Sequence, residues 1–365
     1  MKSSTTHRIL TLPIALILLF SIISSVLADD TTNPLIEFLD PTPDNNDFQT
    51  HRYVNINVSI QEENLDTLNY NWNGTNYTMY DDTLVLMYNF DKLASLGEDS
   101  STVVDMTGNG NSGSVTQATW TSLGKYNGAF DFDGTGDSIT TSIDLDTYSS
   151  FTVTGWVYPR DTGESGTRTG FFGQNDAFET LWDGTTLNYW TESGDCDITV
   201  EKNQWVHLAL QYHSSTIYIY KNGALANSVS GGGSSSYNFN IGGGGINSET
   251  GNTLDGIIDE IRIWNRCLTE DEIYQQYVLN LQKYNSTQWY LTVNQSKDAT
   301  SQLEDGVYTY QVFAEDTGSL QTTSPQRTIY INVDPTPPVP ELSSFLLVSV
   351  GLLLSITIFK TKKKR

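Results

Sequence analysis

The residues best suited to chemistry in this sequence are oxygen-bearing side chains that alternate with other residues between positions 105 and 111. Asp105, Thr107, Asn109 and Asn111 place oxygens at every second position, and the glycines at 108 and 110 permit tight curvature. Calcium-binding loops also space their oxygen ligands by two. Because Thr116 stands where an EF-hand requires glutamate, a calcium ion here would need a carboxylate from elsewhere in the chain.

A second candidate acid lies in the segment GIIDEIRIW, residues 256–264. Side chains alternate between the two faces of a strand, so Asp259 is expected on the apolar face with Ile257 and Ile261. A buried carboxylate is costly unless it is paired, hydrogen-bonded or bound to a metal. The same alternation puts Glu260 on the opposite face, so the two acids are not expected to form the facing carboxylate pair of a retaining glycosidase.

Other catalytic groups receive little support from the sequence. Between residues 30 and 341 there are three histidines, His51, His207 and His213. The pattern WVHLALQY predicts that His207 is a core residue of a strand and not a catalytic base. The glycine-rich stretch at 231–245 lacks the lysine and the strand–helix context of a phosphate-binding loop.

Sugar rings dock on exposed aromatic side chains that have polar groups at their edges. The segment LWDGTTLNYW offers Trp182, Tyr189 and Trp190, with Asp183 and Asn188 beside them. These three aromatic residues are the predicted ligand-binding residues. The alternative is that they fill the core of a sandwich.

Short alternating segments and Gly/Asn/Asp turns dominate residues 31–334 and predict an all-β protein. The landmarks from residue 84 to 277 are, in order, LVLMYNFD, VDMTGNGNSGSV, GAFDFDG, FTVTGWVYP, NQWVHLAL, IYIYKNG and GIIDEIRIWNRCLTEDEI. Together they resemble the laminin-G-like, concanavalin-A-like jelly-roll family over residues 85–281. The resemblance implies an extracellular recognition module that binds glycan or protein ligands.

Jelly rolls of this family often carry a structural calcium ion near such a loop, close to the last core strand. We therefore predict that Asp105, Asn109, Asn111 and Asp259 hold one calcium ion. The alternative is an Asx-type turn in which Asp259 is bonded to backbone amides.

The segments on either side of this module resemble each other more than they resemble the module. Residues 34–84 and 284–334 are each too short for a seven-stranded immunoglobulin-like sandwich of about 100 residues, but together they are long enough. Asp305 to Tyr308 resembles the tyrosine corner of such domains. We predict one split immunoglobulin-like domain interrupted by the jelly roll, with two small β modules in series as the alternative. Thr269 to Glu272 has the form of a capping box and predicts one short helix over 270–281.

Two covalent modifications follow from simple motifs. Glycosylation sequons occur only in the two flanking segments, at Asn57, Asn73, Asn76, Asn285 and Asn294. The sequence contains two cysteines, Cys196 and Cys267. Outside the cell two thiols tend to pair, so a disulfide between them is a prediction that requires them to be close.

Both ends of the chain read as targeting segments. Residues 1–28 have the basic start and apolar run of a secretory signal peptide. Residues 342–359 are apolar and long enough to cross a bilayer, and the basic residues 360–365 would remain cytoplasmic. The Pro-rich residues 335–341 predict a stiff spacer. The segment PTPPVPELSSFLLV also resembles prokaryotic C-terminal sorting signals, although Leu342 stands where the archaeal form usually has phenylalanine.

Charge narrows the choice of partners. The chain has 43 acidic and 19 basic residues and a formal net charge of −24, which disfavours binding to nucleic acid. The sequence thus predicts a non-catalytic cell-surface binding or adhesion protein, anchored to the membrane by its C-terminal helix. An envelope component without a specific ligand and a divergent glycoside hydrolase are the alternatives.

Overall fold

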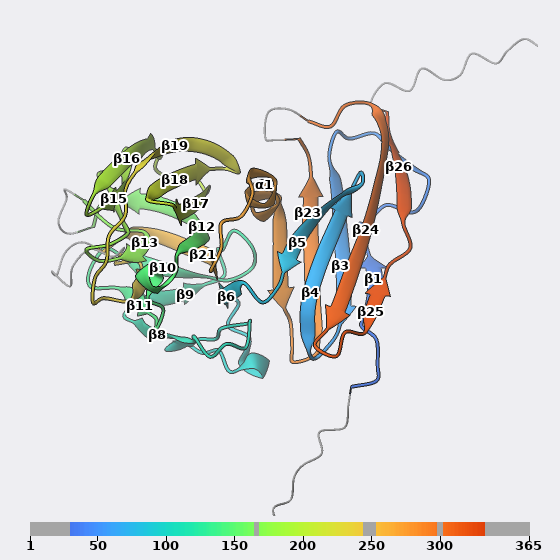
Figure 1. Ribbon diagram of the computed structural model, residues 1–365, viewed down its shortest axis with the longest axis horizontal. Helices are drawn as coiled ribbons and strands as arrows, with labels where there is room; N and C mark the ends of the chain where they lie inside the picture. Colours follow the sequence, from blue (N-terminus) through green and yellow to red (C-terminus); the bar gives the residue numbers. More distant parts are fainter. Residues whose placement is uncertain (1–29, 164–167, 244–252, 298–301, 333–365) are drawn as a thin grey trace, which may run out of the picture. The chain divides into compact units, whose positions relative to one another are not determined.

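The computed structural model describes residues 30–163, 168–243, 253–297 and 302–332, and the described residues from Thr32 onward fall in one compact unit. Strands dominate it, which confirms the prediction of an all-β fold (Figure 1). The predicted signal segment 1–28 and the C-terminal segments 335–365 lie outside the described residues. In the part of the chain that is described, no helix has the length and apolar character needed to span a membrane.

The middle of the chain, from β6 to β21, folds into a set of antiparallel sheets that we call the middle sandwich. Its largest sheet has the order β19-β18-β17-β12-β21-β10-β9, and β6 also pairs with β21. Two smaller sheets of the middle sandwich have the orders β13-β20-β11-β8-β7 and β14-β15-β16. The strands of the large sheet are β6 (Leu84–Tyr88), β9 (Thr119–Thr121), β10 (Ala129–Asp133), β12 (Ser150–Asp161), β17 (Val206–His213), β18 (Thr216–Lys221), β19 (Ala224–Ser230) and β21 (Asp255–Trp264). Those of the other two are β7 (Thr102–Val103), β8 (Gly113–Thr116), β11 (Ser138–Thr140), β13 (Phe172–Gln174), β14 (Glu179–Trp182), β15 (Thr186–Thr191), β16 (Gly194–Thr199) and β20 (Phe239–Ile241).

Strand β21 departs from simple alternation. Its register with β12 shifts between the pairs formed by Thr154 and Trp156, and Glu260 has a left-handed φ of 55°. This bulge places an extra residue in β21. As a result, Ile258 and Ile261 both enter the core of the middle sandwich. The predicted face assignment was therefore wrong, because it assumed an unbroken period of two.

The two flanking segments pair with each other through β3 with β23, β4 with β24 and β2 with β26 (Figure 1). One sheet has the order β1-β3-β23-β22 and the other β2-β26-β24-β4-β5, with β25 beside β24. We call these two sheets the flanking sandwich. Its strands are β1 (Leu35–Leu39), β2 (Asp47–Gln49), β3 (Val54–Gln61), β4 (Leu65–Trp72), β5 (Thr75–Tyr80), β22 (Leu279–Lys283), β23 (Gln288–Gln295), β24 (Gly306–Asp316), β25 (Gln321–Thr323) and β26 (Arg327–Ile331).

The single α-helix among the described residues, α1 (Glu270–Val278), joins the two sandwiches. Its capping box is present as predicted, with the Thr269 side chain and the Glu272 backbone amide hydrogen-bonded. The helix ends earlier than the predicted residue 281, because Leu281 already lies in β22. Helix α1 contacts β19 of the middle sandwich and β5 and β23 of the flanking sandwich. A second hydrophobic core therefore runs from the flanking sandwich through α1 to Trp264. Two short 3₁₀ turns, Ala94–Leu96 and Leu145–Thr147, complete the fold.

Candidate functional site

The predicted calcium loop is held together by its own hydrogen bonds. Asp105 Oδ1 accepts the backbone N–H groups of Met87 at 3.2 Å and Thr107 at 3.1 Å, and Oδ2 accepts that of Asn111 at 3.1 Å. The side-chain amides of Asn109 and Asn111 donate to the carbonyls of Leu84 and Val85. The bond from the Thr107 N–H to Asp105 Oδ1 is the one an Asx-type turn makes. The bonds with Met87, Leu84 and Val85 tie the loop to β6.

Asp259 lies at a different place in the middle sandwich. Its Oδ2 accepts the backbone N–H of Tyr126 at 2.9 Å, and no hydrogen bond among the described residues joins it to the Asp105 loop. Backbone N–H groups already bond both carboxylate oxygens of Asp105. A calcium ion held by Asp105, Asn109, Asn111 and Asp259 stays a prediction.

The bulge in β21 brings Asp259 close to a buried ion pair. Glu260 and Arg262 are 1% and 2% exposed, and Arg262 Nη2 donates to Glu260 Oε2 at 2.6 Å. The same nitrogen donates to the carbonyl of Leu281 at 3.0 Å, and Asn89 Nδ2 donates to both Glu260 and Leu281. This network ties β21 to β6 and β22, the strands through which the chain passes between the two sandwiches.

Burial dominates the electrostatics of this network. Burial and the neighbouring Glu260 carboxylate raise the pKa of Asp259 well above its usual range. Burial also raises the pKa of Glu260, whereas the guanidinium of Arg262 opposes that shift. His207 lies nearby between Trp156 and Tyr277, at ring distances of 5.2 and 5.9 Å. Burial lowers the pKa of His207 to about 3, so it is neutral, and its predicted role as a core residue is confirmed.

Two of the three aromatic residues predicted to bind ligand fill the core instead. Trp182 and Tyr189 are both 0% exposed and belong to the core of the middle sandwich. Trp182 Nε1 donates to the carbonyl of Val200 at 3.1 Å. Only Trp190, which alternates with Tyr189 on β15, is partly exposed. The prediction was therefore wrong for Trp182 and Tyr189, because their side chains point into the core, and for Trp190 it stays a prediction.

The predicted disulfide is not formed, since Cys196 and Cys267 are both free thiols. Cys196 lies on β16 opposite Tyr189, whereas the Cys267 thiol donates to the carbonyl of Tyr212 at 3.5 Å. Burial raises the pKa of Cys196 to about 12 and also raises the pKa of Cys267. Neither thiol therefore has the thiolate character that reactivity requires.

The five sequon asparagines all lie in the flanking sandwich. Asn73, Asn76 and Asn294 are exposed, whereas Asn57 and Asn285 are partly buried. The Asn57 side chain is hydrogen-bonded on both sides, to the carbonyl of Asp40 and to the Thr292 hydroxyl. A glycan on one of the three exposed asparagines would therefore disturb the structure least. Glycosylation of all five stays a prediction.

A cleft that the sequence did not reveal offers the best site for a ligand. It has a volume of about 420 Å³, which is within the range of small-molecule sites. Trp120 on β9 is half-buried in it, and Tyr284, directly after β22, is 53% exposed. We call it the Trp120 cleft. Its lining residues are Asp91, Leu93, Trp120, Ser122, Asn127, Gly128, Gln282, Lys283 and Tyr284.

The polar groups of the Trp120 cleft are held in fixed positions. Asp91 Oδ1 accepts the backbone N–H of Gly128 at 3.1 Å, and Oδ2 accepts Gln282 Nε2 at 2.5 Å. Burial raises the pKa of Asp91, and these two hydrogen bonds oppose the shift. Trp120 Nε1 donates to the carbonyl of Phe90 at 2.8 Å, which fixes the indole plane.

The backbone around the Trp120 cleft is strained. Phe90, Lys92 and Asn127 have φ values of 59°, 55° and 50°, a conformation that costs free energy and is often found at functional sites. A Cβ atom at Gly128 would lie 2.5 Å from the Phe90 carbonyl oxygen and 2.7 Å from Trp120 Nε1. Only glycine therefore lets the β9–β10 connection approach the indole this closely.

The sequence held a weak signal for this cleft. Trp120 follows a turn and is isolated from other aromatic residues, and Tyr284 comes three residues after the end of the predicted helix. The two positions are 164 residues apart, in segments predicted to belong to different domains. Their proximity depends on β22 lying beside the connection between β9 and β10, where Asp91 accepts hydrogen bonds from both Gln282 and Gly128.

Comparison with known proteins agrees with the architecture of the middle sandwich. Residues 133–274 match the family model described as the concanavalin A-like lectin/glucanases superfamily. No curated protein was found to match the sequence.

Solved structures show limited similarity. The binding domain of Paraclostridial Mosquitocidal Protein 1 is 16% identical with a TM-score of 0.43, and the match covers 54% of this chain and 52% of that one. This chain thus spans about half of that domain. Domain 4 of AbnA, a GH43 extracellular arabinanase from Geobacillus stearothermophilus solved with arabinotriose, is 23% identical with a TM-score of 0.39, covering 53% and 97%. A Trypanosoma rangeli sialidase is 14% identical with a TM-score of 0.42, covering 55% and 33%.

The family match covers the later landmarks, from FTVTGWVYP onward, and confirms the laminin-G-like resemblance for residues 133–274. Residues 133–274 are therefore similar to the concanavalin A-like lectin/glucanases superfamily.

Proposed function

We propose that this protein is a non-catalytic cell-surface binding module that holds a glycan in the Trp120 cleft. The observation that carries the proposal is the combination, in one cleft, of the aromatic faces of Trp120 and Tyr284 with the polar groups of Asp91, Asn127 and Gln282. Sugar rings combine apolar faces with hydroxyl edges, and an aromatic surface beside fixed donors and acceptors complements both.

The placement of the acids supports binding over catalysis. Asp91 is the only carboxylate among the described residues that line the cleft, whereas glycoside hydrolysis usually requires two. Because of the bulge, Asp259 and Glu260 lie on the same face of β21, contrary to the sequence-based expectation. Both are buried. Glu260 is occupied by Arg262 and Asn89, so this pair does not offer an accessible acid and nucleophile.

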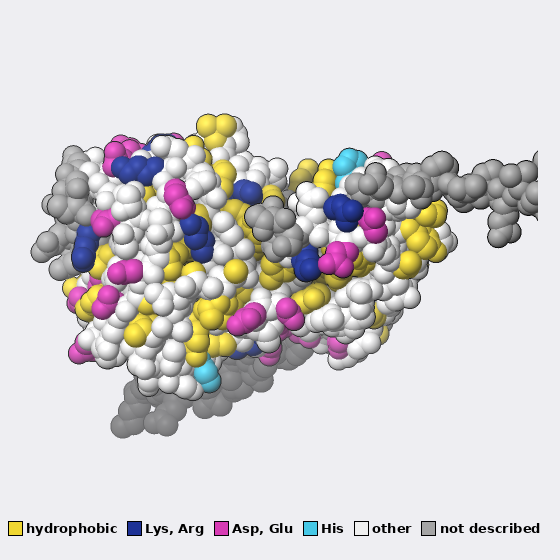
Figure 2. Space-filling model, turned by 90° about the horizontal axis from the view of Figure 1, so that it is seen from above, with side chains coloured by type: hydrophobic (Ala, Val, Ile, Leu, Met, Phe, Trp, Pro, Cys, Tyr) yellow, Lys and Arg dark blue, Asp and Glu magenta, His cyan; other side chains and the backbone are white. Residues whose placement is uncertain are grey.

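Surface charge supports a neutral partner over a nucleic acid. On the face drawn in Figure 2, Lys and Arg side chains are scattered among neutral and acidic groups and do not gather into one patch. Together with the net charge of −24, this distribution gives no track for a phosphate backbone.

We expect the alanine substitution of Tyr284 to weaken glycan binding by about tenfold or more while leaving the fold intact. Tyr284 is more than half exposed, so its removal costs little stability, whereas an aromatic anchor usually dominates a small binding site. The measurement is a glycan array with the purified protein, followed by titration of the hits and by capture of the same labelled glycan on intact cells.

The matched control is Tyr237→Ala, which removes a tyrosine of similar exposure that does not line the cleft. Equal binding by wild type and the Tyr284 variant would contradict the assignment of the cleft. An array without hits would favour an architectural role in the envelope, and capture only by broken cells would contradict the surface location.

We also infer that the flanking sandwich is a single immunoglobulin-like domain interrupted by the middle sandwich. The full-length pairing of β3 with β23 and of β4 with β24 supports this inference. So does the Tyr308 hydroxyl, which donates to the carbonyl of Glu304 at 3.1 Å as in a tyrosine corner.

Residues 30–84 expressed alone are therefore expected to remain unfolded, because β3 and β4 lose their central partners. Far-UV circular dichroism and urea titration measure this directly. A cooperative unfolding transition of that fragment would favour two small modules in series instead.

A further inference from the structure

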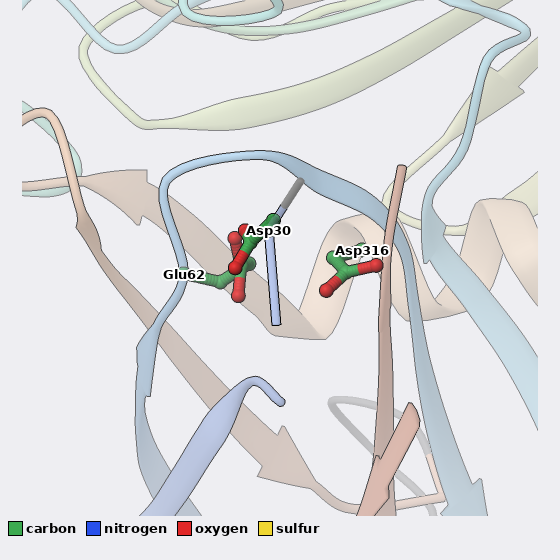
Figure 3. A group of neighbouring side chains, drawn as sticks. All are labelled: Asp30, Glu62 and Asp316. Carbon is green, nitrogen blue, oxygen red and sulfur yellow. The ribbon is translucent and has the colours of Figure 1, made fainter. Parts of the chain in front are cut away.

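Two buried carboxylates face each other in the flanking sandwich, far along the chain from the predicted calcium loop. Glu62 follows β3 and Asp316 ends β24, and the two are 5% and 1% exposed. Carboxylate oxygens of the two residues lie within 4.8 Å of each other, and Figure 3 shows their side chains on neighbouring segments. Asp30, also labelled there, belongs to the separate unit of residues 1–31.

Backbone amides fix the orientation of both carboxylates. Asp316 Oδ1 accepts the N–H groups of Gly318 at 2.7 Å and Leu320 at 2.9 Å. Glu62 Oε1 accepts the N–H of Asn64 at 2.7 Å. The other oxygen of Asp316, Oδ2, is buried and accepts no hydrogen bond from the described residues. A buried, unpartnered carboxylate oxygen is costly, so this atom requires a ligand.

The surroundings of the pair are acidic. Burial and the carboxylates of Glu315, Asp82, Asp81 and Asp316 all raise the pKa of Asp66. Asp316 makes no ion pair with a lysine, arginine or histidine of the described ranges. Several negative charges thus gather here, and the group that would balance them at Asp316 is not a side chain of the described protein.

We propose that Glu62 and Asp316 bind a hard divalent cation of the calcium class. Calcium binds carboxylate oxygens at about 2.3–2.6 Å, so two oxygens on one ion can be separated by at most about 5 Å. The observed separation satisfies this limit. The cation neutralises the pair, takes the unpartnered Asp316 Oδ2 as a ligand, and completes its shell with water. By joining the end of β3 to the end of β24, it links the two sheets of the flanking sandwich.

The test is a calcium titration of the purified full chain after removal of metal with chelator, read by thermal unfolding and by calorimetry. Calcium at millimolar concentration is expected to raise the melting temperature by several degrees, since extracellular calcium sites bind at about 10⁻⁴ to 10⁻³ M. The substitution Asp316→Asn is expected to abolish this shift. Its side-chain oxygen still accepts the amides of Gly318 and Leu320, so the loop keeps its hydrogen bonds.

The matched control is Asp105→Asn, which alters the loop predicted from the sequence and leaves Glu62 and Asp316 untouched. It is expected to retain the calcium shift of the wild type. A wild-type protein whose melting temperature ignores calcium would overturn the proposal, and so would a shift that persists in Asp316→Asn. A shift lost only in Asp105→Asn would place the ion in the Asp105 loop and likewise overturn it.

Discussion

Replacing Arg262 with methionine is expected to lower the free energy of unfolding by about 3–5 kcal/mol, the usual cost of removing one partner of a buried ion pair. Glu260 would then remain buried with Asn89 as its polar partner. The carboxylates of Asp91 and Glu98 also act on Glu260 and raise its pKa, so the uncompensated charge would lie in an acidic setting. Urea unfolding of the purified protein measures the loss.

Two variants make this expectation specific. Lys221→Met removes a cation of similar length from the more exposed pair with Glu201 and should cost no more than about 1 kcal/mol. Adding Glu260→Gln to Arg262→Met should restore part of the stability, because it removes the charge left unpaired. A loss in Arg262→Met no larger than that in Lys221→Met would show that the buried pair contributes little.

Replacing the neighbouring Asp259 is expected to have the opposite effect on stability at neutral pH. Because burial raises its pKa in the folded state, folding favours the protonated form. Its contribution to stability is complete below the unfolded pKa of about 3.9 and is lost as the pH rises. Asp259→Asn should therefore flatten the decline in stability above about pH 4, and at pH 7 it should leave stability unchanged or increased.

Replacing Trp182 with alanine is expected to cost about 3–5 kcal/mol of stability, the range for large aromatic residues removed from a core. The Trp182 ring packs against Phe171 at 5.5 Å, and its loss also frees the Val200 carbonyl from the indole N–H. Trp182→Phe should cost less, because most of the volume remains. Thermal and urea unfolding measure both variants.

This experiment separates a core role from a binding role for the aromatic cluster on β14 and β15. Trp190→Ala, on the partly exposed face of the neighbouring strand, serves as the control and should cost clearly less. Should Trp182→Ala instead keep its stability and lose a glycan identified on the array, the core assignment would be refuted.

Local patterns predicted those elements that local interactions determine. The capping box at Thr269 predicted the start of α1 because its two hydrogen bonds are made between neighbours in the chain. The alternating segments predicted the strands for a similar reason. The landmarks of residues 84–277 also predicted the family, and the match confirmed the resemblance over residues 133–274.

What could not be predicted depends on register and on distant pairing. The bulge at Glu260 is not encoded by glycine, and it moved Asp259 onto the side of the ion pair. The Trp120 cleft requires β22 to lie beside the connection between β9 and β10, and the Glu62–Asp316 pair requires β3 and β24 to end near each other. In each case the partners are more than 100 residues apart, so no window of sequence contains both.

The short connections between the two sandwiches have a mechanical consequence. The chain enters the middle sandwich three residues after β5 and returns into β22 directly from α1. In the flanking sandwich, β3 is hydrogen-bonded to β23 and β4 to β24. Tension applied between Leu35 and Ile331 is therefore borne by strand pairs of the flanking sandwich, first by β1 with β3 and by β26 with β2 and β24. The roughly 200 residues of the middle sandwich act as a protected length of chain, which is drawn out only after the flanking sandwich has opened.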